Sequence, residues 1–143
     1  MERIVFADTA FWIALTYKRD QLHLPAQAWR RYIAAAGAKV VTTEPVLWEW
    51  LNALSATGTR IAAAQGYERC HADPRIEVVC LTPVLRVAAL DMYRSRPDKA
   101  WSLTDCLSFT LMHERSIAVA LAADRHFQQA GFRALLLEEP PAF

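Results

Sequence analysis

The stretch Asp98–Phe132, DKAWSLTDCLSFTLMHERSIAVALAADRHFQQAGF, carries the pattern that decides the fold. It predicts a helix opened by Ser102-Leu103-Thr104-Asp105, a strand over Ile117–Ala123, and a short helix that begins at Arg125. The strand segment is apolar throughout, which is typical of a parallel strand buried on both faces. Asp124 follows at the point where that strand should end. One carboxylate therefore stands at the entrance of each helix.

The composition predicts a single globular domain over residues 1–143. A content of 54% hydrophobic and 22% charged residues is that of a folded chain rather than a disordered one. No apolar run approaches the roughly 20 residues that a membrane helix needs, and Ile4–Ala7 is too short for a signal peptide. We therefore expect a cytoplasmic protein that does not enter a membrane.

Charge and cysteine content argue against three further classes. The three cysteines, Cys70, Cys80 and Cys106, are scattered and lack CxxC spacing, which argues against a zinc site and against a disulfide framework. A net charge of +1 argues against binding nucleic acid by bulk electrostatics, but it leaves room for a local site.

Strands and helices alternate along the rest of the chain. Further strands are predicted over Ile4–Ala7, Lys39–Thr43, Ile76–Leu81 and Arg133–Leu137. The other predicted helices run from Thr9 to about Tyr17, Pro25 to about Ala36, Pro45 to Leu54, Arg60 to His71 and Pro83 to about Arg96. This order favours a three-layer α/β/α sandwich around a central, mainly parallel sheet of Rossmann-like topology. Ligands bind such sheets at the carboxyl ends of strands, where the strand order reverses, and Asp8 and Asp124 both follow strand ends.

Three acidic residues have a structural explanation when each is taken alone. Asp8 and Asp124 precede helices, where Asp is a favoured N-cap, and Ser102-x-x-Asp105 fits a capping box. Glu49 differs, because it lies inside its predicted helix between Trp48 and Trp50. A carboxylate in apolar surroundings is costly unless it is paired or bound to metal, although a solvated surface Glu is the alternative.

Taken together, Asp8, Glu49, Asp105 and Asp124 predict a site for hard cations. Four oxygen ligands without His or Cys suit Mg²⁺ or Mn²⁺, and such ions serve phosphodiester hydrolysis. The glycines form no phosphate-binding loop, and no GxSxG elbow is present. The four histidines show no metal-binding spacing and are interpreted as surface or helix-end residues.

With these residues in view, the chain resembles a PIN domain, and most of all the VapC-type toxins of bacterial toxin–antitoxin pairs. The resemblance covers nearly the whole length and rests on four segments in order: Val5–Thr9, Thr42–Asn52, Ser102–Phe109 and Ala123–Phe132. It departs from the family at Ala122, where members often carry a hydroxyl residue two positions before the fourth acid.

The resemblance implies an endoribonuclease that depends on Mg²⁺ or Mn²⁺, with Asp8, Glu49, Asp105 and Asp124 as metal ligands and catalytic residues. Thr9 and Thr104 match hydroxyl residues that support the acids. The implied partners are an RNA substrate, single-stranded or in a loop, a second copy of the chain in a homodimer, and an antitoxin. A segment of that antitoxin would lie over the acidic pocket, with an Arg entering it.

Several interpretations remain open from the sequence. The basic residues Arg94, Lys99 and Arg125 are candidates for phosphate contact, with solvated surface as the alternative for each. The five tryptophans are expected to lie mostly in the core. A PIN-fold binding module with little or no nuclease activity is the second candidate function, and a metal-dependent phosphatase is the third.

Overall fold

The protein folds as a five-stranded parallel sheet with helices on both faces. The structure is a computed structural model and describes residues 3–141. The strands are β1 (Ile4–Ala7), β2 (Lys39–Thr43), β3 (Ile76–Val79), β4 (Val119–Leu121) and β5 (Arg133–Ala134). Their order across the sheet is β3-β2-β1-β4-β5, and every pairing is parallel. The predicted fold class is confirmed.

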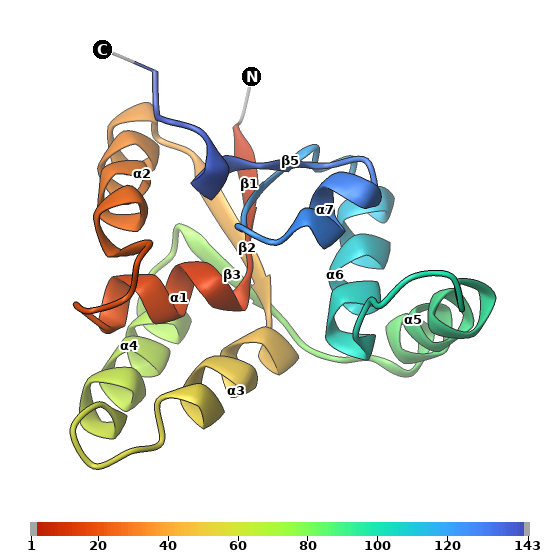
Figure 1. Cartoon of the computed structure of the whole chain (residues 1–143), viewed down its shortest axis with the longest axis horizontal. Helices are drawn as coiled ribbons and strands as arrows, with labels where there is room; N and C mark the ends of the chain where they lie inside the picture. The colour runs from red at the N-terminus through yellow and green to blue at the C-terminus, as the bar shows by residue number, and fades with distance from the viewer. Residues whose placement is uncertain (1–2, 142–143) are drawn as a thin grey trace.

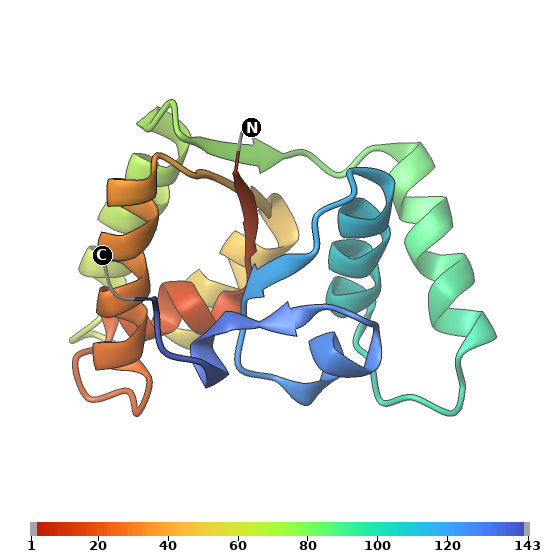
Figure 2. The ribbon, with the colours of Figure 1, turned by 90° about the horizontal axis from the view of Figure 1, so that it is seen from above.

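The helices form two groups (Figures 1 and 2). In chain order they are α1 (Thr9–Thr16), α2 (His23–Ala36), α3 (Glu44–Ala53), α4 (Arg60–Ala72), α5 (Pro83–Ser95), α6 (Leu103–Glu114) and α7 (Arg125–Gln129). Helices α1 to α4 pack against one another on one side of the sheet, and α5 packs on α6 on the other side.

Local sequence accounts for where the helices begin and end. Helices α3 and α5 each have a threonine at the N-cap position. The hydroxyl of Thr43 accepts a hydrogen bond from the amide of Val46, and the hydroxyl of Thr82 accepts one from the amide of Leu85. Gly37 follows α2 in the left-handed region at φ 67°, which glycine adopts without a steric penalty.

The core lies between the sheet and both helix layers. Its largest fully buried side chains include Phe6, Phe109 and Phe127, and the ring centroids of Phe109 and Phe127 lie 4.9 Å apart in an edge-on arrangement. This packing fixes α6 and α7 against the sheet, and with them the residues that precede each helix.

Three strands are shorter than the sequence predicts. Strand β3 ends at Val79 and is only half-buried, because it lies at the edge of the sheet and carries Glu77. Strand β4 covers Val119–Leu121 rather than Ile117–Ala123. Its backbone hydrogen bonds to the neighbouring parallel strands do not extend over the whole apolar run. The last predicted strand, Arg133–Leu137, is wrong beyond Ala134.

The residues that follow β5 form a 3₁₀ helix over Leu135–Leu137. Leu135 and Leu136 are both buried, although successive residues of a strand point to opposite faces. The helical turn lets both side chains enter the core, which an apolar run in the sequence does not reveal.

Candidate active site

Two of the predicted acids flank the point where the strand order reverses. The chain leaves β1 at Asp8 and later leaves β4 shortly before Asp124, and β1 and β4 are neighbours on the two sides of that point. The backbone amide of Asp8 donates to the carbonyl of Leu121, 3.2 Å away, so the ends of the two strands are joined. The architecture therefore brings these acids to the edge where parallel sheets bind ligands.

Asp8 is a buried carboxylic acid, with 8% of its surface exposed. It occupies the N-cap position of α1 but makes no side-chain capping hydrogen bond. Burial raises its pKa to about 7; the amide of Thr9 lowers this pKa, whereas the charges of Asp105, Glu49 and Asp124 raise it further. All three other predicted acids thus act electrostatically on Asp8.

Glu49 reaches the same region from α3. The hydroxyl of Thr9 donates to its carboxylate over 2.9 Å, and the same hydroxyl lies 3.4 Å from the carbonyl of Val46. Thr9 therefore supports an acid, as the resemblance implied. The expected apolar surroundings are wrong, because Glu49 and its neighbour Trp48 are both exposed. The carboxylate is held by a hydroxyl group rather than by burial.

Asp105 and Asp124 both cap helices. Asp105 and Ser102 form a complete capping box at the start of α6, with bonds of 3.1 and 3.0 Å between side chain and backbone. Asp124 accepts from the amide of His126 over 2.9 Å at the start of α7. The side chain of Asp105 is 16% exposed and that of Asp124 is 47% exposed. The caps orient both carboxylates at the edge of the site.

His126 is part of the site, and sequence reasoning missed it. Its Nδ1 atom lies 3.3 Å from a carboxylate oxygen of Asp105 and 3.3 Å from one of Asp124. The interpretation of this histidine as a surface or helix-end residue is therefore incomplete. Its position two residues after Asp124 was the available signal, because the first turn of a capped helix lies beside the cap.

The acids surround Asp8 without forming a closed ligand cage. Within residues 3–141, no three Asp, Glu, His or Cys side chains are gathered closely enough to hold a metal ion as they stand. The donor set nevertheless fits a hard cation, since it offers four carboxylates, one of them buried among charges of its own sign.

The predicted supporting residues take different positions. Thr104 makes no side-chain hydrogen bond to an acid in the part of the chain that the structure describes; its carbonyl accepts from Ser108. Arg94 forms an exposed pair with Asp91 on α5, 3.7 Å apart, whereas Arg125 directly follows Asp124 and Lys99 is half-buried. Of the three candidates for phosphate contact, Arg125 is therefore the one that directly adjoins an acid of the site in the sequence.

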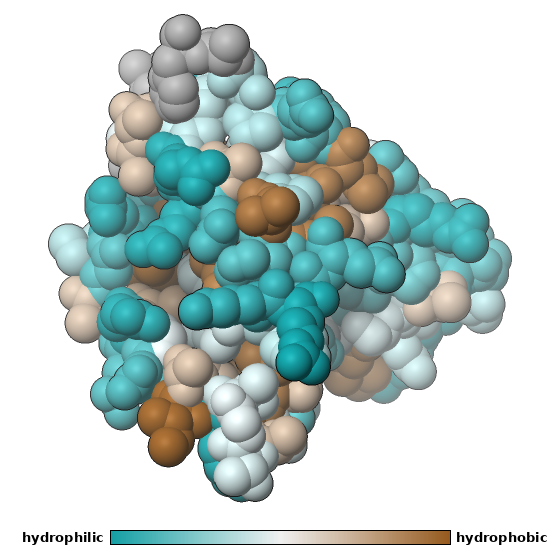
Figure 3. All heavy atoms as spheres, turned by 60° about the vertical axis from the view of Figure 1, so that its left-hand side comes forward, coloured by the Kyte–Doolittle hydropathy of each residue, from teal (hydrophilic) through white to brown (hydrophobic). Residues whose placement is uncertain are grey.

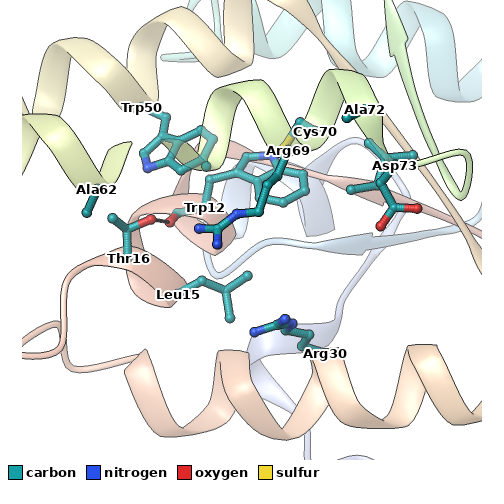
Figure 4. A pocket seen from close by; sticks show the side chains of 12 residues that line it. Trp12, Leu15, Thr16, Arg30, Trp50, Ala62, Arg69, Cys70, Ala72 and Asp73 are labelled. Carbon is teal, nitrogen blue, oxygen red and sulfur yellow. Dashed lines mark hydrogen bonds between the residues drawn. The ribbon is translucent and has the colours of Figure 1, made fainter. Parts of the chain in front are cut away.

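A separate cleft of about 530 Å³ opens between α1, α2 and α4 (Figure 4). The stacked rings of Trp12 and Trp50 form one wall, with centroids 5.6 Å apart, and Arg30 and Arg69 reach toward it from α2 and α4. The indole nitrogen of Trp50 is buried and has no hydrogen-bond partner among the described residues. Trp12 and Trp50 share their helices with Thr9 and Glu49, so α1 and α3 contribute to both the cleft and the acidic site.

The face shown in Figure 3 is mainly hydrophilic, with small, separate hydrophobic patches. Over residues 3–141, no helix is both long and apolar enough to cross a membrane.

Comparison with known proteins identifies the family. The PIN domain family model matches residues 5–133. The chain is 32% identical over 130 residues to the 23S rRNA-specific endonuclease VapC20 from two strains of Mycobacterium tuberculosis. This match covers 90% of this chain and 95% of the relative. It also resembles the crystal structure of Mycobacterium tuberculosis VapC20, described as a sarcin-ricin loop cleaving toxin. For that structure the TM-score is 0.81, the identity is 28%, and the match covers 91% of this chain and 97% of the other. The resemblance found in the sequence is confirmed, and the chain belongs to the PIN domain family.

Proposed function

We propose that this protein is a metal-dependent endoribonuclease and the toxin of a toxin–antitoxin pair. The observation that carries the proposal is the buried Asp8 at the reversal of strand order, with three further carboxylates acting on it. Membership of the PIN domain family and the names of the relatives, an rRNA-specific endonuclease and a toxin, support the same reaction. An enzyme that acts on ribosomal RNA would work in the cytoplasm.

The residues proposed to hold Mg²⁺ or Mn²⁺ are Asp8, Glu49, Asp105 and Asp124. When bound, such an ion supplies positive charge against the phosphodiester and makes water a better nucleophile at neutral pH. Small side-chain movements would be needed to draw the carboxylates together, and the exposed side chains of Glu49 and Asp124 have the freedom for them.

The side chains themselves prepare the site. Asp8 is largely ionised only above pH 7, because its pKa is about 7 without metal, and a bound cation would favour the ionised form. Thr9 orients Glu49, and the two capping arrangements hold Asp105 and Asp124. Arg125, next to Asp124, is the proposed phosphate contact.

The proposed substrate is an RNA loop of the sarcin–ricin type, since the structural relative is described as cleaving that loop. The test is cleavage of a synthetic RNA hairpin that carries the loop, with Mn²⁺ and with EDTA. We expect the parent to cut the hairpin only with metal, and Asp8→Asn and Asp105→Asn to lose most of the activity.

The same assay separates the alternatives. A binding module would retain the hairpin without cutting it, and a phosphatase would release phosphate from p-nitrophenyl phosphate while leaving the hairpin intact. Equal cleavage by the parent and both variants would contradict a reaction based on these acids.

A homodimer is also proposed, through the outer face of α5. Helix α5 buries Leu85 and Ala89 toward α6, whereas Val84 and Val87, on its opposite side, remain largely exposed. Light scattering at micromolar concentration should give the mass of a dimer for the parent and of a monomer for Val84→Glu. A monomeric parent would contradict this assignment.

An antitoxin that covers the acids with one segment is also proposed, because the structural relative is described as a toxin. The separate cleft between α1, α2 and α4 offers apolar walls and two arginines for the same partner (Figure 4). Co-purification of the protein with the product of a neighbouring gene, and loss of RNA cleavage in that complex, would support the pairing. Full cleavage by such a complex would contradict it.

A further inference from the structure

Trp48 differs from every other tryptophan of the chain in its exposure. Trp12, Trp29, Trp50 and Trp101 are all buried, as the sequence predicted for most of them, whereas Trp48 is 61% exposed. The helix that carries it is firmly packed, since Val46, Leu47 and Trp50 on either side are buried. The large ring of Trp48 thus projects from a fixed position without contributing to the core.

The neighbours of Trp48 place it beside the acidic site. It directly precedes Glu49 in α3, so the two side chains leave adjacent positions of the same helix. Glu49 contacts Thr9 at the start of α1, and its charge acts on Asp8. An RNA strand whose phosphate lies at the acids would therefore bring a neighbouring nucleotide to Trp48.

A polar network supports the other side of this tryptophan. Tyr67 is within hydrogen-bonding reach of the Trp48 side chain and donates its hydroxyl hydrogen to Glu44 over 3.0 Å. His71 contacts the same carboxylate at 2.6 Å, and the rings of Tyr67 and His71 lie 4.8 Å apart. Glu44 stands one helical turn before Trp48, so α3 and α4 together hold the indole in place.

We propose that Trp48 is a stacking platform for one nucleobase of the RNA that the acids cleave. Single-stranded and looped RNA is recognised by splaying bases onto aromatic side chains, and every base has a face that can stack. The polar neighbours, Glu44, Tyr67 and His71, surround the indole with polar rather than apolar groups, which favours a nucleotide over the apolar surface of a protein partner. This inference rests on the proposed ribonuclease function and deepens it.

The test combines a protein change with an RNA change. Trp48→Ala and Trp48→Phe are compared with the parent on the sarcin–ricin hairpin with Mn²⁺, with Leu24→Ala, an exposed apolar residue of α2, as the matched control. We expect Trp48→Ala to weaken cleavage efficiency by about 5- to 150-fold, the range found when one base stack is removed, mainly through KM. Trp48→Phe should retain most of the efficiency, and Leu24→Ala all of it.

The RNA side identifies the base. Hairpins in which each loop nucleotide in turn is abasic should include one that loses efficiency with the parent but loses nothing further with Trp48→Ala. Such non-additivity is the signature of a direct contact. Purely additive losses at every position, or parental efficiency in Trp48→Ala, would overturn the proposal while leaving the ribonuclease function intact.

Two other outcomes also decide the matter. If the parent neither binds nor cuts any of the hairpins, the proposed substrate is wrong, and the proposed stacking platform is wrong with it. If Trp48→Ala cuts normally but changes the mass of the protein in light scattering, Trp48 is a contact between protein chains rather than between protein and RNA.

Discussion

Asp8 combines two features that are each unfavourable in a folded protein without metal. Its carboxyl group is buried, and Asp105, Glu49 and Asp124 place negative charge around it. Burial has the larger effect on its pKa, and the neighbouring charges add to it. A residue that costs stability in this way is typical of a functional site rather than of a helix cap.

The pH dependence of stability should reveal this cost. The pKa of Asp8 is about 7 in the folded state, above its ordinary value of 3.8. Between pH 3.8 and pH 7, Asp8 is therefore mostly protonated in the folded state and mostly ionised in the unfolded state. Stability therefore falls as pH rises from about 4 to about 7, by on the order of 4 kcal/mol if Asp8 acts alone.

Removing the charge should reverse that loss. We expect Asp8→Asn in EDTA to be more stable than the parent at pH 8 by about 2 kcal/mol, because a buried amide retains part of the burial cost. The difference should disappear toward pH 4. Urea unfolding at both pH values measures it, and a parent that is more stable than the variant at pH 8 would show that Asp8 is stabilising as a carboxylate.

Asp105 tests whether a cap and a ligand can be the same residue. Asparagine can still accept from the amide of Ser102 but carries no charge, whereas alanine loses both properties. Asp105→Asn should therefore unfold in EDTA within about 0.5 kcal/mol of the parent, and Asp105→Ala should lose about 1 kcal/mol.

Added Mn²⁺ separates the two roles of Asp105. A metal that binds only the folded state stabilises the parent by mass action, and both variants should lose most of that gain. Thermal melts with EDTA and then with excess Mn²⁺ provide the comparison. If the difference in melting temperature between the parent and Asp105→Asn does not change on adding Mn²⁺, Asp105 caps its helix but does not bind the metal.

The sequence predicted Asp8, Asp105 and Asp124 because acidic residues at strand and helix ends are visible as a pattern, and Glu49 because it stands inside an otherwise apolar helix segment. It did not predict His126 between Asp105 and Asp124, since that contact depends on how α7 packs beside α6. The resemblance implied that Thr9 supports an acid, but the sequence did not show that this acid is Glu49 or that Glu49 is exposed, because the contact joins residues that are 40 positions apart.

At the scale of elements, α4 depends on a single glycine. A Cβ atom at Gly66 would lie 2.5 Å from the ring of Trp50, which is buried and stacked on Trp12. The close approach of α4 to α3 is therefore possible only without a side chain at this position, and the cleft between α1, α2 and α4 has its shape for the same reason.

Gly66→Ala should accordingly destabilise the protein despite the better helix propensity of alanine. Overpacking typically costs about 1–3 kcal/mol and the gain in propensity is about 1 kcal/mol, so we expect a net loss of about 1 kcal/mol. Gly58→Ala is the control, since nothing lies within 4 Å of a Cβ atom there. Chemical denaturation measures both, and equal stability of the two variants would show that Trp50 moves without cost.

The existence and type of the elements were predictable, but the ends of several strands were not. Ile4–Ala7 and Lys39–Thr43 coincide with the observed β1 and β2, because a helix signal follows each of them directly. Ile117–Ala123 and Arg133–Leu137 are longer than β4 and β5, since an apolar run marks burial and does not show where the ladder ends. Leu135 and Leu136 are buried through a helical turn instead.

For the whole molecule, the order β3-β2-β1-β4-β5 brings together four acids that are separated by as many as 116 positions, from Asp8 to Asp124. The alternation of strands and helices predicted a mainly parallel α/β/α sandwich but not this strand order, and the resemblance to PIN domains implied the same four acids. Neither could show how closely the acids lie: within residues 3–141, no three Asp, Glu, His or Cys side chains are gathered closely enough to hold a metal ion as they stand.

Binding of Mn²⁺ in solution tests the central claim most directly. Titration calorimetry at pH 7.5 should show that the parent binds the ion and that Asp8→Asn, Glu49→Gln, Asp105→Asn and Asp124→Asn each bind it more weakly. We expect losses of more than about tenfold, because even groups that only support ligands have effects of that size. Asp91→Asn, an exposed acid on α5, should bind like the parent. Equal Mn²⁺ affinity in the parent and all four site variants would contradict the account.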